Sequence, residues 1–303
     1  MNNMEYVSYK IDKQIRDKIM IHYASYSVDN FGEYIIFSAK KDDITITIYE
    51  SKKGYKVLFA GDNVLDEARL FNSEASLKEQ KDTIKKEYLD LNTQIGSDEV
   101  GFGDFFGPLV VVSALYTPSL QDILDKIKDS KKLDDNFILE FVPTILDRVQ
   151  YSKLTVRNQK YNEMIDRGYN MNEMKALLHN RALYNLKEKV TNCNSFYIDQ
   201  FCDEDKYFSY IQFEEKKVTN LNFHTKGESY YPSVALASMI SRYYFLKEFE
   251  ALNNYYNTTF PKGASKTVDK FALEFIDKHG IKELDFVSKK NFINYKNIIA
   301  EKK

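Results

Sequence analysis

The sequence has few cysteines, no excess of positive charge and no long apolar run, and each absence excludes a class of protein. Only two cysteines, Cys193 and Cys202, occur among 303 residues. Because neither has metal-ligand spacing or a histidine at a finger-like distance, we expect no zinc site and no disulfide framework. The formal net charge is −2. No bulk positive field therefore draws nucleic acid to the chain, and such binding must use local patches.

Membrane insertion and secretion are also unsupported by the sequence. The longest nearly continuous apolar run, Pro108 to Tyr116, is less than half the roughly 20 residues that a membrane-spanning helix needs. The N-terminus is interrupted by charge at Glu5 and Lys10 and has no cleavage site of a signal peptide. We therefore expect a cytoplasmic protein without membrane contact, and a monomer. With 43% hydrophobic residues, the chain can bury a sizeable core.

Residues 1–70 predict a small α+β domain. After a short strand, apolar residues at a spacing of four indicate one helical face: Ile11, Ile15, Ile19 and Tyr23. Three strands are indicated next, joined by polar turns: Glu33 to Ala39, Ile44 to Tyr49 and Tyr55 to Phe59. In the middle strand isoleucines alternate with Thr45, Thr47 and Tyr49, so we expect the isoleucines to face the helix. The outward face is either a solvated surface or a platform for an extended ligand.

Residues 71–91 are polar and charged, and we interpret them as a helical linker. Residues 92–303 then form a larger domain. Helical stretches separate its strand candidates. These strand candidates are Ile95 to Val100, Leu109 to Tyr116, Tyr151 to Val156 and Phe196 to Asp199. This mixture of strands and helices, with long helices at the end, predicts an α/β domain.

The stretch from Gly96 to Pro108 holds the densest set of residues that could carry chemistry. Adjacent side chains of a strand point to opposite faces, so Asp98 and Glu99 would not normally both enter one core. At a strand end over a cleft, both can reach a metal. The glycines that follow lack a Cβ atom, so their backbone N–H groups can closely approach a sugar-phosphate chain. The alternative is a simple polar turn.

Other charged residues are ambiguous when each is taken alone. Asp199 ends an aromatic strand, where a carboxylate needs a partner or a cation to offset its desolvation. It is either a satisfied structural acid or a ligand. Glu228 precedes a helical run of small residues and could simply cap that helix. The basic segment from Asp129 to Leu133 could be a solvated charge run.

Taken together, the motifs resemble type 2 ribonucleases H over roughly residues 92–290, in the same order and at similar separations. The matching segments are Gly96 to Pro108, Asp129 to Leu133, Phe196 to Gln200, Phe223 to Ser229 with Leu236 to Leu246, and Phe260 to Ser265. The sequence is most similar to the ribonuclease HIII branch, since it lacks the Gly-Arg-Gly of ribonuclease HII and has a separate N-terminal unit. The resemblance implies a ribonuclease H-like catalytic domain with a small α+β TATA-binding-protein-like N-terminal domain.

The resemblance implies an endonuclease that hydrolyses the RNA strand of RNA/DNA hybrids and leaves 5′-phosphate and 3′-hydroxyl ends. It implies a site of four carboxylates that holds two Mg²⁺ or Mn²⁺ ions about 4 Å apart. In that site Asp98 is shared by both ions, and Asp199 and Glu228 each favour one ion. Glu99 lies near the metal and the 2′-hydroxyl of the substrate. The aspartate that is usual at the fourth position of ribonuclease HII is glutamate here, as in ribonuclease HIII.

Substrate contacts are also implied by the resemblance. The 2′-hydroxyl that distinguishes RNA from DNA would be read by backbone groups of Gly101, Phe102 and Gly103. Phe102 departs from the small or polar residue expected between these glycines. Phosphate contacts that weaken with salt are expected from a set of mostly basic residues: Ser130, Lys131, Lys132, Lys226, Lys52, Lys53 and Lys56.

Three alternatives remain open. A catalytically silent hybrid-binding protein would not need all four acids. An enzyme of the ribonuclease HII type would remove single ribonucleotides from DNA. A metal-dependent phosphatase acting on small substrates would share the acids but would not need a separate sheet domain.

Overall fold

The computed structural model describes residues 5–28, 34–51, 54–77, 88–129 and 134–302. The chain divides into two compact units, Met1–Lys85 and Lys86–Lys303. Among the described residues, no helix combines the length and the apolar character needed to cross a membrane. Cys193 and Cys202 are free thiols.

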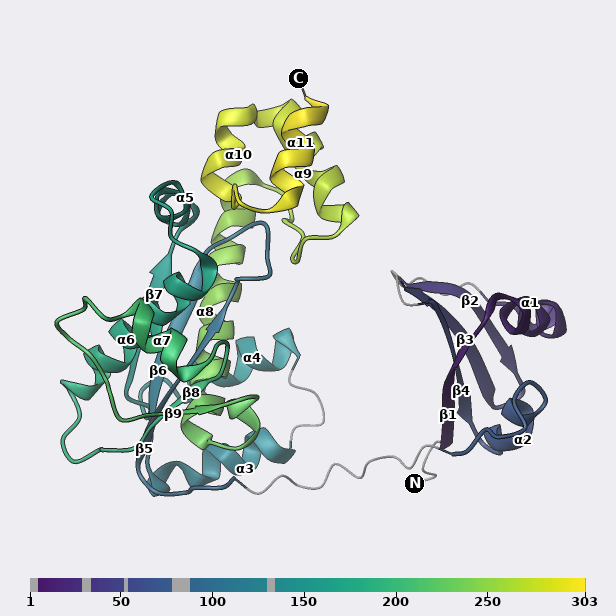
Figure 1. Ribbon diagram of the computed structural model, residues 1–303, viewed down its shortest axis with the longest axis horizontal. Coiled ribbons are helices and arrows are strands. Elements are labelled where there is room, and N and C mark those ends of the chain that lie inside the picture. Colours follow the sequence, from purple (N-terminus) through teal and green to yellow (C-terminus); the bar gives the residue numbers. More distant parts are fainter. Residues whose placement is uncertain (1–4, 29–33, 52–53, 78–87, 130–133, 303) are drawn as a thin grey trace. The chain divides into compact units, whose positions relative to one another are not determined.

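The N-terminal unit is a four-stranded antiparallel sheet with two helices packed on one face (Figure 1). Its strand order is β1-β4-β3-β2. The strands are β1 (Glu5–Ile11), β2 (Ile35–Lys41), β3 (Ile44–Ser51) and β4 (Gly54–Gly61), and the helices are α1 (Lys13–His22) and α2 (Val64–Arg69). Ile46 and Ile48 of β3 are fully buried with Ile19 of α1. The predicted contact between isoleucines and helix is confirmed.

The opposite face of this sheet carries hydroxyl and basic side chains, as the alternation predicts. Lys10 of β1 pairs in register with Lys56 of β4, which pairs with Tyr49 of β3. Lys10 and Lys56 are both exposed. Thr47, on the same face at the centre of the sheet, is only 5% exposed. The accessible polar groups therefore lie away from that centre.

The described parts of residues 71–91 are not helical. Residues 71–77 form turns, and residues 88–91 form no helix either. Phe71 and Ala75 pack on the core of the N-terminal unit, and Arg69 Nε donates to the carbonyl of Ala75 at 3.2 Å. Residues 71–77 therefore complete the N-terminal unit instead of beginning a helical linker. Residues 78–87 lie outside the described residues.

The C-terminal unit contains a five-stranded mixed sheet of order β7-β6-β5-β8-β9. Strands β7, β6 and β5 are antiparallel neighbours, whereas β5, β8 and β9 run parallel. The strands are β5 (Gln94–Val100), β6 (Leu109–Tyr116), β7 (Tyr151–Val156), β8 (Phe196–Asp199) and β9 (Leu221–His224). The first four match the predicted strands, with β5 one residue longer. The fifth strand was not predicted.

Helices cover both faces of this sheet (Figure 1). Helix α6 (Met171–Lys187) lies on one face, where Ser113 Oγ of β6 donates to the carbonyl of Ala182 at 2.7 Å. Helix α8 (Pro232–Tyr256) lies on the other face. A Cβ atom added at Gly96 would stand 2.5 Å from the backbone nitrogen of Val234. Glycine at position 96 therefore lets α8 approach β5 closely.

The remaining helices surround this three-layer arrangement. Near the C-terminal end of α8 lie α9 (Lys266–His279), α10 (Ile281–Val287) and α11 (Ile293–Glu301). The others are α3 (Gln121–Asp129), α4 (Asp135–Phe141), α5 (Asn158–Asp166) and α7 (Glu204–Tyr210). The core of the unit is apolar and continuous from β6 to the C-terminal helices, so it gives β5 a rigid support.

Candidate active site

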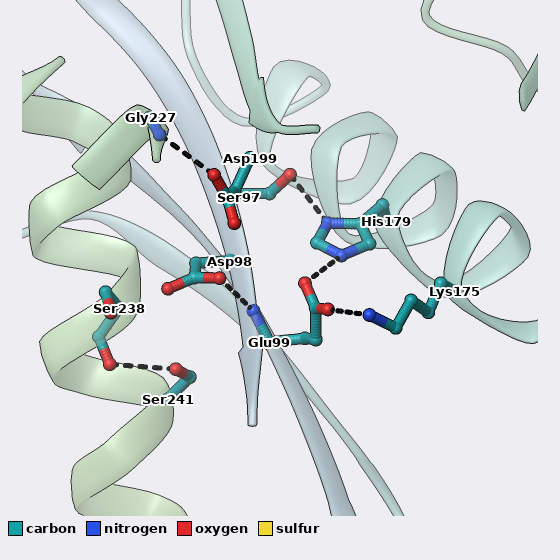
Figure 2. Close-up of polar contacts among 9 residues, drawn as sticks. All are labelled: Ser97, Asp98, Glu99, Lys175, His179, Asp199, Gly227, Ser238 and Ser241. Carbon is teal, nitrogen blue, oxygen red and sulfur yellow. Dashed lines mark hydrogen bonds and ion pairs between the residues drawn. The ribbon is translucent and has the colours of Figure 1, made fainter. Parts of the chain in front are cut away.

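Asp98 lies near the carboxyl end of β5, and Asp199 ends the neighbouring parallel strand β8. Ser97 of β5 lies opposite Ile198 of β8, so Asp98 and Asp199 follow at the same level and on the same face of the sheet. Figure 2 shows the carboxylates of Asp98 and Asp199. Asp199 Oδ1 accepts a 2.8 Å hydrogen bond from Gly227 N. This bond anchors the segment that carries Glu228 to the end of β8.

Asp98 and Glu99 lie on opposite faces of β5, as the alternation of a strand requires. Asp98 faces α8, on which Ser238 lies nearby (Figure 2). Glu99 faces α6, whose Lys175 and His179 it contacts (Figure 2). The two adjacent acids therefore have different partners.

The surroundings of Asp98 disfavour its charge. Burial raises the pKa of its carboxyl well above the ordinary value, and the negative charges of Glu99 and Asp199 act in the same direction. The nearby hydroxyl of Ser238 and a 2.7 Å hydrogen bond from the backbone N–H of Glu99 oppose this shift in part. A cation beside Asp98 and Asp199 would offset both the burial and the repulsion.

The surroundings of Glu99 favour its charge. Burial alone would raise its pKa, but the hydrogen bond from His179 and the positive charge of Lys175 hold that pKa well below its usual range. Lys175 Nζ lies 2.5 Å from Glu99 Oε1, and His179 Nε2 lies 2.8 Å from Glu99 Oε2. Glu99 is therefore an ionised carboxylate with both oxygens engaged.

Glu228 lies in a single 3-10 turn, Gly227–Ser229, just before α8. It does not cap that helix, because the N-cap residue is Tyr231 and it makes no side-chain cap bond. A Cβ atom added at Gly227 would lie 3.5 Å from the Cα atom of Asp199. The turn thus packs directly on the residue that ends β8, with Glu228 next along the chain.

The donor set fits a hard divalent cation, although the four acids are not all gathered together. Among the described residues, no three His, Cys, Asp or Glu side chains come close enough to form a metal site. Glu99 lies on the α6 side of β5, with its oxygens bonded to Lys175 and His179. Asp98 and Asp199 supply the carboxylate oxygens that Mg²⁺ and Mn²⁺ prefer, and the unfavourable charge of Asp98 matches that chemistry.

The glycine-rich loop between β5 and β6 has a defined shape. Gly101 has φ +99°, and a Cβ atom there would lie 2.2 Å from the carbonyl oxygen of Pro108. The Phe102 ring is buried in a small core cluster with Leu109 and Tyr161. An apolar core position explains why a large apolar residue stands between the glycines. Any contact of Phe102 with substrate must therefore come mainly from its backbone.

A buried lysine holds the far end of this loop. Lys289 Nζ donates to the carbonyls of Asp104 and Gly107, each at 2.6 Å. Its backbone N–H donates to the carbonyl of Phe105 at 3.0 Å. Burial lowers the pKa of Lys289 to about 7, against the opposing charge of Asp104. The loop is thus fixed by a residue near the end of the chain.

Two of the predicted phosphate-binding residues lie in the described part of the chain. Lys56 and Lys226 are exposed, and Lys226 has a left-handed backbone with φ 59°. Five others lie outside the described residues: Lys52, Lys53, Ser130, Lys131 and Lys132. Sequence reasoning missed Lys175, His179 and Lys289. For the first two a signal existed, since residues four apart share one side of a helix.

Comparison with known proteins identifies the family of this chain. A family model described as Ribonuclease HII matches residues 95–295, and a model described as a domain of unknown function matches residues 7–84. A relative from Bacillus mycoides named Ribonuclease HIII is 40% identical over 276 residues, 86% of each chain. One of that name from Listeria monocytogenes is 36% identical over 94% of each chain. The chain belongs to the ribonuclease HIII family.

Solved structures extend the similarity across both units. The crystal structure of Bst-RNase HIII in complex with Mn²⁺ matches with a TM-score of 0.68 and 34% identity, over 98% of this chain and 99% of that one. The ribonuclease H2 of Pyrococcus horikoshii matches 69% of this chain with a TM-score of 0.59. At 23% identity, it shows the fold alone. As a ribonuclease HIII family member, the chain is a ribonuclease H endonuclease with a ribonuclease H-like catalytic fold.

Proposed function

We propose that this ribonuclease cuts the RNA strand of RNA/DNA hybrids where Asp199 ends β8 beside Asp98 of β5, with Asp98, Glu99, Asp199 and Glu228 as the residues that hold two divalent ions. One observation carries the proposal. Asp98 and Asp199 lie at the same level of adjacent strands, and burial and repulsion raise the pKa of Asp98. An acid pair of this kind is stabilised by a bound cation.

The bound ions supply an activated water and stabilise charge on the attacking and leaving oxygens. The residues of the chain would hold these ions at fixed positions. Gly227 N orients the carboxylate of Asp199, and the backbone N–H of Glu99 orients that of Asp98. Glu99 adds a further negative charge close to Asp98. Both Mg²⁺ and Mn²⁺ fit these oxygen donors. The Mn²⁺ in the related crystal structure supports Mn²⁺ as one of the ions that the site accepts.

Recognition of RNA in this proposal depends on the backbone of Gly101, Phe102 and Gly103. The loop is fixed at Gly101 by its left-handed φ and at the other end by Lys289, so its N–H and C=O groups are preorganised to contact a 2′-hydroxyl. Lys226 is exposed beside the Glu228 turn and supports a phosphate contact there.

The N-terminal unit, in the same proposal, binds the hybrid through its outward sheet face. Lys10 and Lys56 are register partners on that face, and hydroxyl side chains accompany them. Basic and hydroxyl groups are typical donors to nucleic-acid phosphates. We assign the N-terminal unit, including residues 71–77, to this binding and residues 92–303 to catalysis. Cytoplasmic location and a monomeric state stay predictions from the sequence.

The test compares labelled substrates with Mg²⁺, with Mn²⁺ and with a chelator. The substrates are an RNA/DNA hybrid, the matching RNA and DNA duplexes, and a DNA duplex that contains one ribonucleotide. We expect metal-dependent cleavage of the RNA strand of the hybrid, with 5′-phosphate and 3′-hydroxyl products. Binding of the hybrid without cleavage would identify a silent binding protein. Preferred cutting at the single ribonucleotide would identify an activity of the ribonuclease HII type.

A further inference from the structure

A chain of polar contacts crosses the α6 side of β5. Ser97 Oγ and His179 Nδ1 are 2.8 Å apart, and His179 Nε2 lies 2.8 Å from Glu99 Oε2. Lys175 Nζ reaches the other oxygen of Glu99. An ionised carboxylate only accepts hydrogen bonds, so Nε2 of His179 donates. Two residues one helical turn apart on α6 therefore hold both oxygens of Glu99.

Aromatic rings enclose these polar groups. The Phe201 ring stacks on His179 with ring centres 5.5 Å apart and planes inclined by 26°. Lys175 Nζ lies 5.2 Å from the centre of the Phe201 ring and 4.9 Å from that of Phe102. His179 is fully buried. In such close packing the two α6 side chains have little freedom to leave Glu99.

We propose that His179 and Lys175 are positioning residues that fix the direction of the Glu99 carboxylate for the metal site. The proposal rests on the assignment of Glu99 to that site. An ionised carboxylate has about four lone-pair positions, so the bonds to His179 and Lys175 leave lone pairs on Glu99 for a divalent ion or its water. Polar partners that hold a ligating carboxylate typically contribute about 10- to 100-fold to metal affinity or activity.

The competing explanation is that His179 only fills the space between α6 and β5. Two matched variants separate the explanations. In His179→Gln the amide nitrogen reaches about as far as Nε2, so a donor to Glu99 remains. In His179→Asn the side chain reaches only as far as Nδ1, so the contact with Ser97 remains and the donor to Glu99 is lost. A purely structural role predicts similar effects of the two variants.

The experiment titrates each full-length variant with Mn²⁺ by calorimetry and measures hybrid cleavage in parallel. We expect His179→Asn to weaken Mn²⁺ binding roughly tenfold or more, and His179→Gln by less than about threefold. In a Glu99→Gln background, neither substitution should change Mn²⁺ affinity by more than about twofold, because the partner that they act through has lost its charge. Hybrid binding in chelator should be unchanged. Lys160→Met, which breaks an exposed ion pair with Glu163 on α5, is the control.

Equal losses of Mn²⁺ affinity in His179→Asn and His179→Gln would overturn the positioning role. So would a loss of Mn²⁺ affinity that is as large in the Glu99→Gln background as in the unaltered chain. Wild-type affinity and turnover in Glu99→Gln alone would remove Glu99 from the metal site and overturn the positioning role, whereas metal-dependent hybrid cleavage by the unaltered chain would still support the proposed function. If His179→Asn does not fold, Lys175→Met serves instead. We expect its turnover to fall at least about tenfold and Lys175→Arg to recover most of it. Normal turnover in a folded Lys175→Met chain would contradict the proposal.

Discussion

The two sheets of this protein offer different surfaces to a ligand. The N-terminal sheet packs both described helices of its unit on one face and presents the other, with Lys10, Tyr49 and Lys56, outward. The C-terminal sheet is covered by α6 on one face and α8 on the other. Its proposed site lies where Asp199 ends β8 beside Asp98 of β5. A bare face suits binding over a wide area, whereas a strand end suits chemistry at one point.

The strongest test of this division is the removal of charge at the end of β5. Asp98→Asn keeps the size of the side chain but loses the carboxylate that we assign to both ions. Turnover should therefore fall by roughly a thousandfold or more, while hybrid binding measured in chelator persists. Asp147→Asn, at an exposed position of the same unit, is the matched control. Turnover near that of the control would remove Asp98 from the site.

The next test is at the neighbouring strand end. Asp199→Asn keeps an oxygen that can still accept from Gly227 N, so the turn that carries Glu228 should stay in place. We expect a loss of turnover of roughly a hundredfold or more, because the charge on one side of the site is gone. Thermal melting in chelator should not decrease. A lower melting temperature with normal turnover would make Asp199 a structural acid.

Glu228→Gln should have a smaller effect than either aspartate variant. A ligand to one ion can be partly replaced by water, so we expect a loss of turnover of roughly tenfold that excess Mn²⁺ partly restores. The measurement is turnover as a function of Mn²⁺ concentration. A loss that Mn²⁺ does not relieve would point to a role other than ion binding.

Deleting residues 1–70 tests the other side of the comparison. If the bare face binds the hybrid, the Michaelis constant should rise by roughly tenfold while the maximal rate changes little, because mainly uniform binding is lost. The difference from the full chain should shrink at high salt, where phosphate contacts are screened. A truncated chain with an unchanged melting transition that binds hybrid as tightly as the full protein would assign the unit another role.

The smallest expected effect concerns single lysines of the bare face. Lys56→Ala should weaken hybrid binding by roughly twofold to threefold and reduce the salt dependence by about one phosphate contact. Lys18→Ala makes the same charge change on α1, which packs on the opposite face. Equal effects of the two substitutions would show that only net charge matters.

Strands with a continuous apolar or aromatic pattern were predictable from the sequence. The bounds of β6, β7 and β8 agree with the predicted ones, because polar turns or loops flank each of them. β9 is as short as β8, but Asn222 and His224 interrupt its apolar residues, so it lacks the continuous apolar and aromatic run of β8. The segment after α2 is as polar as a linker, but tertiary contacts of Phe71 and Ala75 decide its structure.

The acids were easier to predict than their partners. Asp98 and Glu99 stand in one motif, and alternation along a strand already places them on opposite faces. The contacts of Glu99 with Lys175 and His179 join residues 76 and 80 positions away, and they depend on how α6 packs across the sheet. No local pattern contains that information. The ring of Phe102, unexpected between the glycines, is explained only by the core around it.

Lys289 also determines how late in its synthesis the enzyme can become active. Its bonds to the glycine-rich loop join residues 182 and 185 positions apart. At ordinary rates of translation, those intervening residues take roughly 10 to 40 seconds to synthesise. During that time the strand with Asp98 and Glu99 exists, but the loop beyond it has no anchor. A growing chain, or one cut before Lys289, should therefore be a silent nuclease, and activity should begin only when synthesis is almost complete.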